Sequence, residues 1–177
     1  VAQRLAGYWQ SCKRRNALGI CEELRGAAHL PAEAQGVQFA EGAVVRAVEL
    51  GCNVLDSAIN YRHQRSERAM GTALGSLVRL GRAARDEILV ATKGGFLPFD
   101  GEYPANPRAY VHETFIRPAI LRPEDLVAGC HCLAPAYLRH QLARSRQNLG
   151  LDCVDIYYVH NPETQLQEIS RDELHAR

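Results

Sequence analysis

The sequence predicts an α/β fold, because helical segments and short strand-like segments alternate along most of the chain. Three segments have apolar residues at helical spacing. Each ends at a glycine and is followed by an apolar run that ends in a polar residue. Strands that alternate with helices of this length pair in parallel through crossover connections. The predicted helices span Glu41–Leu50, Ser66–Leu80 and Ala136–Leu149, and the predicted strands span Cys52–Leu55, Glu87–Thr92 and Cys153–Val159.

The first helix and strand are predicted by an apolar face and a glycine stop. The apolar face of Glu41–Leu50 consists of Ala43, Val44, Ala47 and Val48. Gly51 follows as a C-terminal cap, a position whose left-handed backbone favours glycine. The strand Cys52–Leu55 then ends at Asp56, and aspartate seldom lies in an apolar core.

The second helix has signals at both of its ends. Ser66 is a candidate N-terminal cap, and Glu67 places a negative charge in the first turn, where the helix dipole favours it. The apolar stripe consists of Ala69, Met70, Ala73, Leu74, Leu77 and Val78. Gly81 ends this helix, and the strand Glu87–Thr92, EILVAT, leads directly to Lys93.

The third helix is expected to begin just after Pro135, because proline is favoured in the first turn. Its inward-facing residues are predicted to be Tyr137, Leu138, Leu142 and Leu149. Gly150 caps it, and the strand Cys153–Val159, CVDIYYV, leads to His160.

Two segments do not follow this alternation. Residues 94–135 form a proline-rich insert that is too long for an ordinary connection. Loops of this length are usually binding loops, lids or disordered inserts, and because this one follows Lys93 we expect it to lie over an active site. Among the first forty residues, Ala17–Cys21, ALGIC, is predicted to be a first strand.

Length and composition limit the possible functions. With 177 residues the chain is long enough for one hydrophobic core, so we expect a single domain over residues 1–177. A hydrophobic content of 46% argues against disorder, and a net charge of +1 argues against nucleic-acid binding. No apolar stretch is long enough to cross a membrane and no signal peptide is recognised, which indicates a cytoplasmic protein without membrane partners.

The six cysteines do not indicate a disulfide scaffold in a chain of this length. The only close cluster is Cys130-His131-Cys132. A structural zinc site needs four ligands, and no second pair lies nearby in the sequence. We therefore expect no metal, and a zinc-binding module stays a lower-ranked alternative.

Three polar residues follow directly on the last apolar residue of a strand: Asp56, Lys93 and His160. Tyr61 lies on the loop after the first of these strands. The carboxyl ends of parallel strands share one face of a sheet or barrel, so these four side chains are expected to converge in one cleft.

These four residue types suit the donation of a proton to a carbonyl oxygen. A tyrosine hydroxyl is a weak acid, and a nearby ammonium group makes it a better proton donor. A carboxylate keeps a partly buried lysine charged, and a neutral histidine can donate a hydrogen bond to the substrate. Taken singly, each residue also has an ordinary explanation as a turn, packing or surface residue. No protein side chain delivers a hydride, so a reduction needs an external donor such as a nicotinamide.

The segments around these residues resemble those of the aldo/keto reductases. GCNVLDSAINY followed by RSERAMGTAL, within Gly51–Leu74, is similar to the first signature of that family. ILVATKGG is similar to its lysine-bearing strand, and LGLDCVDIYYVHNP, Leu149–Pro162, is similar to its histidine-bearing strand. One departure is Gln64, which stands where many members have glycine.

The resemblance implies a (β/α)8 barrel of the TIM type, of which this chain would be the N-terminal half with about four β/α units. It implies NADPH-dependent reduction of aldehydes or ketones, so that the partner is a small carbonyl compound. Tyr61 would be the general acid, Lys93 and Asp56 the pair that tunes it, and His160 the residue that orients the carbonyl. Asp56 would also contact the nicotinamide ribose of the cofactor.

The chain is shorter than a complete barrel, which takes roughly 250 residues. The later strands of the family hold most of the cofactor contacts, and no residue is assigned to those contacts here. An unpaired barrel edge would favour self-association. A truncated, non-catalytic protein that acts as a binding or regulatory subunit is therefore the alternative function.

Overall fold

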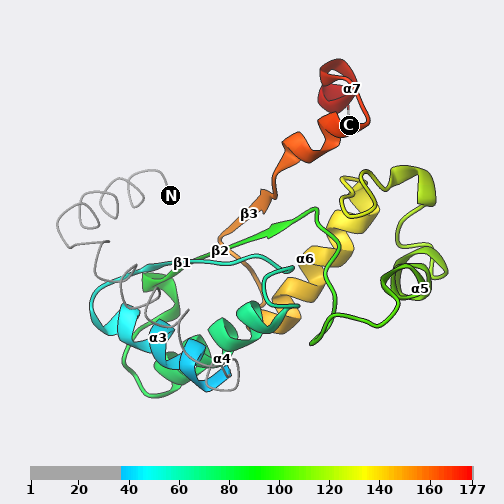
Figure 1. Ribbon diagram of the computed structural model, residues 1–177. Coiled ribbons are helices and arrows are strands. Elements are labelled where there is room, and N and C mark those ends of the chain that lie inside the picture. Colours follow the sequence, from blue (N-terminus) through cyan, green and yellow to red (C-terminus); the bar gives the residue numbers. More distant parts are fainter. Residues whose placement is uncertain (1–36, 177) are drawn as a thin grey trace.

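The centre of the computed structural model, which describes residues 37–176, is a sheet of three parallel strands (Figure 1). The strands are β1 (Val54–Asp56), β2 (Leu89–Gly94) and β3 (Ile156–Val159), and β2 lies between the other two. The α/β class is therefore confirmed, and the described residues form part of a parallel sheet rather than a closed barrel. The predicted strand Ala17–Cys21 lies outside the described residues.

Each strand begins two or three residues later than predicted. The residues directly before β1 and β3 nevertheless already bond to β2, since the amide of Leu89 donates to the carbonyl of Asn53 at 2.8 Å and the amide of Asp155 donates to the carbonyl of Val90 at 3.0 Å. The amide of Cys52 donates to the carbonyl of Ala47 at 2.9 Å, which completes the end of the preceding helix. Before β3, the carboxylate of Asp155 accepts from the amide of Val90 at 2.8 Å and pairs with Arg85 at 2.6 Å. A side chain thus takes the place of a ladder bond there.

The long helices are α3 (Val37–Glu49), α4 (Arg65–Arg79) and α6 (Pro135–Leu149), and they lie on one side of the sheet (Figure 1). The last two begin within one residue of the prediction, whereas α3 begins four residues before Glu41. The glycines predicted to follow the three helices all have a left-handed backbone. They are Gly51, Gly81 and Gly150, with φ of 91°, 64° and 65°.

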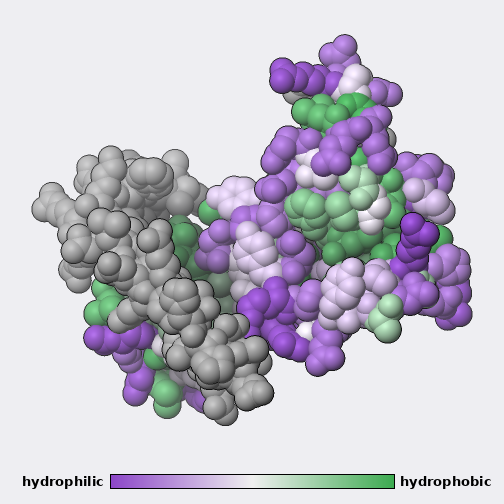
Figure 2. All heavy atoms as spheres, in the orientation of Figure 1, coloured by the Kyte–Doolittle hydropathy of each residue, from purple (hydrophilic) through white to green (hydrophobic). Residues whose placement is uncertain are grey.

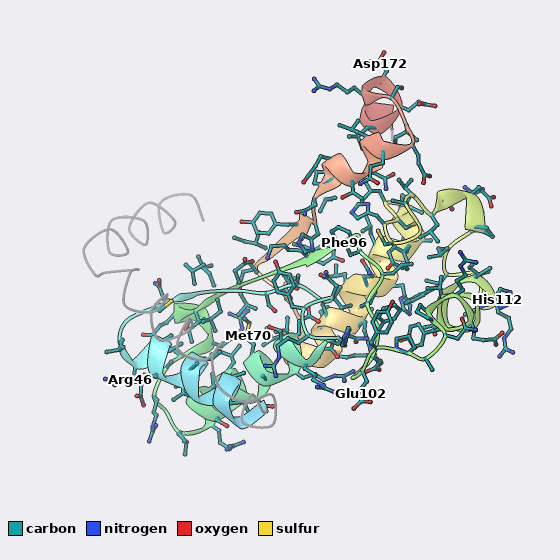
Figure 3. The ribbon with its side chains drawn as sticks, in the orientation of Figure 1. Arg46, Met70, Phe96, Glu102, His112 and Asp172 are labelled. Carbon is teal, nitrogen blue, oxygen red and sulfur yellow. The ribbon has the colours of Figure 1, made fainter. Side chains whose placement is uncertain are left out.

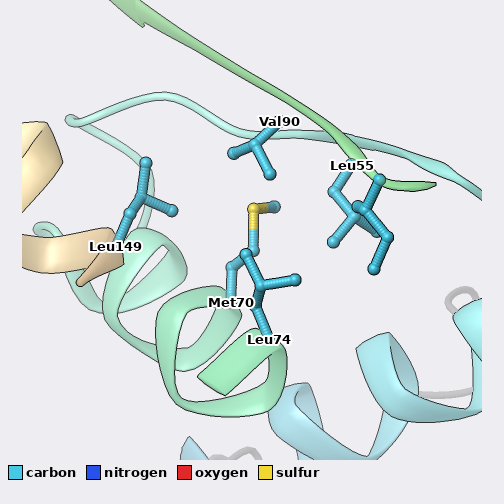
Figure 4. Packing of buried hydrophobic residues seen from close by; sticks show 6 residues of the cluster. Leu55, Met70, Leu74, Val90 and Leu149 are labelled. Carbon is cyan, nitrogen blue, oxygen red and sulfur yellow. The ribbon is translucent and has the colours of Figure 1, made fainter. Parts of the chain in front are cut away.

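The main core lies between the sheet and the apolar face of α4 (Figure 4). It contains buried residues from β1, α4, the end of α6, and β2 with the residue before it, namely Leu55, Met70, Leu74, Ile88, Val90 and Leu149. Val44 and Val48 of α3 pack against this cluster, as the predicted apolar face requires.

The inward face of α6 differs from the prediction. Tyr137 and Leu149 are buried as predicted, but Leu138 and Leu142 are only half-buried, and Gln141 and Ser145 are buried instead. Gln141 faces inward because its side chain binds the backbone after β2. Its Oε1 accepts from the amide of Gly95 and its Nε2 donates to the carbonyl of Phe96, both at 2.7 Å.

The insert, residues 94–135, has secondary structure and a small core of its own. It contains α5 (Pro107–Val111), the π-helical turn η2 (His112–Ile116) and the 3₁₀ turn η3 (Pro123–Asp125). Phe115, Leu121 and Cys132 form a buried cluster with Tyr137 of α6. The insert therefore packs against α6, on the right-hand side of Figure 1.

Short turns complete the described chain. The 3₁₀ turn η1 (Arg85–Glu87) precedes β2, and β3 leads to η4 (Pro162–Gln167) and α7 (Arg171–Ala176). These last two elements form a narrow projection, and Figure 2 shows hydrophobic atoms gathered at its base. Among the residues that the structure describes, no helix is both long and apolar enough to cross a lipid bilayer.

We expect Gly71→Ala to destabilise the fold, because α4 and α6 approach each other closely at Gly71. A Cβ atom there would lie 2.6 Å from the carbonyl oxygen of Leu149. The free energy of unfolding should fall by about 1–3 kcal/mol in urea titrations. Gly75→Ala on the same helix is the matched control. It has open space around its Cβ position and should be neutral or stabilising by up to ~1 kcal/mol. Equal stability of the two variants would contradict this packing.

Candidate active site

All four predicted site residues border one open hollow that runs along one face of the sheet to the carboxyl ends of its strands. The hollow has a volume of about 580 Å³ and is lined by residues from the strands and from the loops that follow β1 and β3. Asp56, Tyr61, Lys93 and His160 are among these residues. The structure thus brings together side chains that are spread over more than one hundred positions of the sequence.

Strand alternation explains why these side chains share one face. Leu55 and Val90 point into the core beneath the sheet. Their neighbours Asp56 and Ala91 point to the opposite face, where they line the hollow together with Lys93.

Lys93 is the most tightly held of the four residues. Its Nζ donates to Oδ2 of Asp56 and to the backbone carbonyl of Ser57, both at 2.7 Å. The lysine side chain is 16% exposed and the aspartate side chain is 51% exposed. The lysine ammonium therefore lies over the end of β1, and the carboxylate that pairs with it remains open to the hollow.

The aromatic ring of Tyr61 lies between the lysine and the histidine. Lys93 Nζ is 5.3 Å from the centroid of the tyrosine ring. The tyrosine and His160 rings meet edge to face, with centroids 5.5 Å apart. Tyr61 is 40% exposed, so its side chain remains accessible from the hollow.

The loop that carries Tyr61 continues into a strained left-handed turn. Arg62, His63 and Gln64 have φ of 49°, 55° and 69°. A left-handed backbone destabilises the fold by roughly 1–2 kcal/mol for each residue that is not glycine. This turn replaces the predicted Ser66 cap. α4 begins at Arg65 after Gln64, without a side-chain cap, and Ser66 Oγ accepts a hydrogen bond from Ser57 instead.

Gln64 holds this turn in place with a buried side chain. Its Nε2 donates to the carbonyl of Phe99 at 3.0 Å. Its Oε1 accepts from Arg144 Nε and from Asn148 Nδ2, both at 3.1 Å. Sequence reasoning missed this role, although the unusual glutamine at a position where glycine is common was a signal for a left-handed backbone.

Glu67, in the first turn of α4, is fully buried beside the lysine strand. Its Oε1 accepts from the hydroxyl of Thr92, which precedes Lys93, and its Oε2 accepts from Asn148 Nδ2 at 2.8 Å. A buried carboxylate is tolerated only when it is hydrogen-bonded. Glu67 therefore fixes α4 to β2 and to α6 directly behind the hollow.

His160 is fixed by its backbone and by its ring. Its amide donates to the carbonyl of Gly94 at 2.8 Å, and ring Nδ1 lies 3.2 Å from Oδ1 of Asn60. Burial, together with the charge of Lys93, lowers the pKa of the His160 imidazole below its usual range, so the ring is neutral at pH 7. Because an amide oxygen only accepts, the contact with Asn60 places the proton of the neutral ring on Nδ1; an Asn60 amide turned by 180° would present NH₂ to Nδ1 and leave the proton on Nε2.

The insert does not cover the hollow, contrary to the expectation of a lid. None of the residues that line the hollow comes from positions 94–135. The insert instead approaches His160 from the side of the sheet end. Phe96, labelled in Figure 3, meets the His160 ring edge to face at 5.1 Å. Residues 94–135 pack on α6 because their own apolar residues are buried there.

The Cys130-His131-Cys132 cluster does not form a metal site in the described residues, where no group of three or more potential ligands comes together. Both ring nitrogens of His131 face protein groups. Nε2 lies 2.7 Å from the carbonyl oxygen of His160, and Nδ1 lies 2.8 Å from Nε2 of Gln165.

Variants of Gln64 test the left-handed turn. We expect Gln64→Ala to lower the free energy of unfolding by about 2–4 kcal/mol, because three hydrogen bonds are lost and the strain remains. Gln64→Gly loses the same bonds but relieves the strain, so its loss should be roughly 1–2 kcal/mol smaller. Urea unfolding measures both differences. An alanine variant at least as stable as the glycine variant would contradict the left-handed backbone.

Acidification should destabilise the fold from about neutral pH downward. Burial lowers the pKa of His131, His140 and His160 below 6.5, the ordinary value for histidine that the unfolded chain regains. Between the folded and unfolded pKa values the unfolded chain binds more protons, so stability is fully present above pH 6.5 and is lost as the pH falls through this window. Urea midpoints between pH 8 and pH 5 measure the effect. Stability that increases on acidification over this range would contradict it.

Comparisons with known proteins found several similar aldo-keto reductases. One relative is the aldo-keto reductase yakc [NADP(+)] of Schizosaccharomyces pombe. It is 28% identical to this chain over 133 residues, which cover 73% of this chain and 30% of that protein. The aldose reductase structure from Schistosoma japonicum is 24% identical with a TM-score of 0.43, over 74% of this chain and 30% of that one. The structure of a candidate aldo-keto reductase from Pseudomonas aeruginosa is 21% identical with a TM-score of 0.45. The match covers 80% of this chain and 43% of that one.

The chain thus spans 30% of the length of the curated relative that it matches. A model of the aldo/keto reductase family matches residues 25–174, which is most of the sequence and includes the whole hollow. The chain belongs to the aldo/keto reductase family.

Proposed function

We propose that this chain carries the proton-donating site of an NADPH-dependent oxidoreductase that reduces aldehydes or ketones to alcohols. The observation that supports this most directly is the position of Lys93 Nζ, bound to Asp56 at 2.7 Å and 5.3 Å from the Tyr61 ring centroid. An ammonium group over the ring can stabilise the negative charge that develops on the phenol when it gives up a proton. Family membership supports the same class of reaction.

Tyr61 is the general acid in this proposal. NADPH, when bound, supplies the hydride that the carbonyl carbon accepts. The Tyr61 hydroxyl gives its proton to the carbonyl oxygen, so that an alcohol forms and a phenolate remains. The Lys93 ammonium stabilises this phenolate until a proton from solvent restores the hydroxyl. The 40% exposure of Tyr61 gives both substrate and solvent access to the ring.

Asp56 has two roles in the proposal. Its Oδ2 keeps the lysine charged and fixes the direction of the ammonium group. Its half-exposed carboxylate faces the hollow, which fits a hydrogen bond to a ribose hydroxyl of the cofactor. The remaining cofactor contacts are not assigned to residues of this chain.

His160 orients the substrate carbonyl. Its neutral ring stands edge to face against Tyr61, so a hydrogen bond from Nε2 would hold the carbonyl oxygen near the tyrosine hydroxyl. Donation from Nε2 therefore needs the Asn60 amide in the orientation opposite to the one in the structure, with its NH₂ group rather than Oδ1 toward Nδ1. The asparagine thereby selects the ring nitrogen that carries the proton.

A second candidate function is a non-catalytic binding or regulatory role, supported by apolar side chains that remain open around the hollow. Val54, Tyr158 and Val159 are 40%, 47% and 44% exposed. Exposed apolar groups next to a strand edge favour association with a partner or with a second copy of the chain. In this role the four site residues would bind ligand without turnover.

Replacement of Tyr61 by phenylalanine tests the catalytic proposal. We expect kcat for aldehyde reduction, followed by NADPH absorbance in the near ultraviolet, to fall by ~100-fold or more, because the proton donor is lost. NADPH binding, followed by fluorescence, should stay unchanged because the ring remains. Tyr103→Phe is the matched control. Tyr103 is 67% exposed and lies outside the lining of the hollow, so its variant should retain full activity.

The outcomes separate the two candidate functions. Turnover that depends on Tyr61 supports the reductase. NADPH binding without turnover of a broad aldehyde and ketone panel supports the non-catalytic role. Absence of both binding and turnover contradicts the reductase proposal for this chain.

A further inference from the structure

His131 is a fully buried histidine that the proposed reaction does not use. It belongs to the insert, yet its ring lies behind the active-site histidine. Its Nε2 is 2.7 Å from the carbonyl oxygen of His160, and its Nδ1 is 2.8 Å from Nε2 of Gln165 in η4. One imidazole therefore contacts both His160, directly after β3, and the turn η4 that follows it.

The partners of His131 determine its protonation. The amide nitrogen of Gln165 is a donor, so Nδ1 of His131 must accept. Nε2 then carries the proton and donates it to the carbonyl oxygen of His160. Both polar atoms of the ring are satisfied, as buried polar groups require.

The position of His131 is itself fixed by the backbone. His131 and Val127 exchange two hydrogen bonds, and Cys132 donates to the carbonyl of Gly95 at 2.9 Å. Gly95 has φ of 134°, and a Cβ atom there would lie 2.6 Å from Nε2 of His131. The glycine two residues after Lys93 thus leaves the space that the imidazole occupies.

The contact completes the support of His160. The amide of His160 is held by Gly94 at the end of β2 and its carbonyl by His131 of the insert, so both sides of this residue are fixed. Asn161, which follows, has a left-handed backbone with φ of 45°. A peptide group that is not held at its oxygen could rotate there, and the ring of His160 would move with it.

We propose that His131 is a positioning residue for His160, which it holds in register with Tyr61 through the hydrogen bond from its Nε2 to the His160 carbonyl. The inference rests on the proposed function only where it concerns turnover. Through this contact the insert supports the site from behind His160 and does not act as a lid over the hollow.

Two variants separate the two hydrogen bonds of His131. The amide nitrogen of a glutamine lies near the place of imidazole Nε2, so His131→Gln retains a donor for the His160 carbonyl. The amide oxygen of an asparagine lies near the place of Nδ1, so His131→Asn retains the acceptor for Gln165 and loses the donor to His160. Thermal unfolding with circular dichroism verifies that both variants are folded.

The direct readout is the ring signals of His160 in NMR spectra of the protein with labelled histidine, a readout that does not depend on activity. Four charged or titratable groups face this ring from the surrounding elements: Asp56 of β1, Lys93 of β2, His131 of the insert and Glu163 of η4. We expect the His160 signals of His131→Gln to match those of the native protein. In His131→Asn they should shift and broaden, because the peptide group is no longer held.

Turnover provides the second readout. We expect kcat of His131→Asn to fall by about 10- to 100-fold, with NADPH affinity unchanged, and that of His131→Gln to stay within about threefold of the native value. Equal effects in both variants, or unchanged His160 signals in His131→Asn, would overturn the inference. If the protein reduces no carbonyl compound, the proposed function fails while the NMR comparison still decides the role of His131.

A measurement on the native protein covers the case in which the asparagine variant does not fold. Long-range ¹⁵N correlations identify which nitrogen of His131 is protonated. Protonation on Nε2 supports the inference, and protonation on Nδ1 overturns it, because His131 would then have no hydrogen to donate to His160.

Discussion

The geometry of the site depends on the ammonium group of Lys93, which joins the ends of two strands. Its side chain is largely buried and would be costly without partners, and Asp56 and the Ser57 carbonyl supply them. Asp56 pairs with Ala91 across the sheet, two residues before the lysine. A slip of one residue between β1 and β2 would turn Lys93 toward the helices, so the ion pair and the strand register require each other.

Polar side chains rather than apolar ones support the site from behind. Glu67 binds the strand residue before Lys93, Gln141 binds the backbone after it, and His131 binds the backbone of His160. Apolar packing alone tolerates many small displacements, whereas a satisfied hydrogen-bond network specifies one arrangement. The ion pairs of Asp100 with Arg68 and Arg144, at 2.7 Å and 2.6 Å, fasten the insert to α4 and α6 near the left-handed turn.

The parts of the fold that the sequence predicted are those with local signals. Apolar periodicity and glycine stops located α4 and α6, and the polar residue after each predicted strand located Asp56, Lys93 and His160, although Asp56 and Lys93 lie within the observed strands β1 and β2. Of the supporting residues, only Gln64 has a local signal, because it stands where glycine is common. Gln64, Gln141 and His131 resemble surface or turn residues in the sequence, because burial of a polar side chain depends on partners that the fold brings from distant positions. The predicted inward positions Leu138 and Leu142 were wrong for the same reason.

The length of the insert correctly indicated a functional segment, but the predicted position over the site was wrong. The insert does reach the site, but its apolar residues are buried against α6 and so hold it beside the hollow rather than over it. It reaches the site through Phe96 at the His160 ring and through His131 at the His160 backbone. Changes in residues 94–135 would therefore act on the orientation of His160, and in the proposed mechanism through it on the rate of proton transfer, more than on the shape of the hollow.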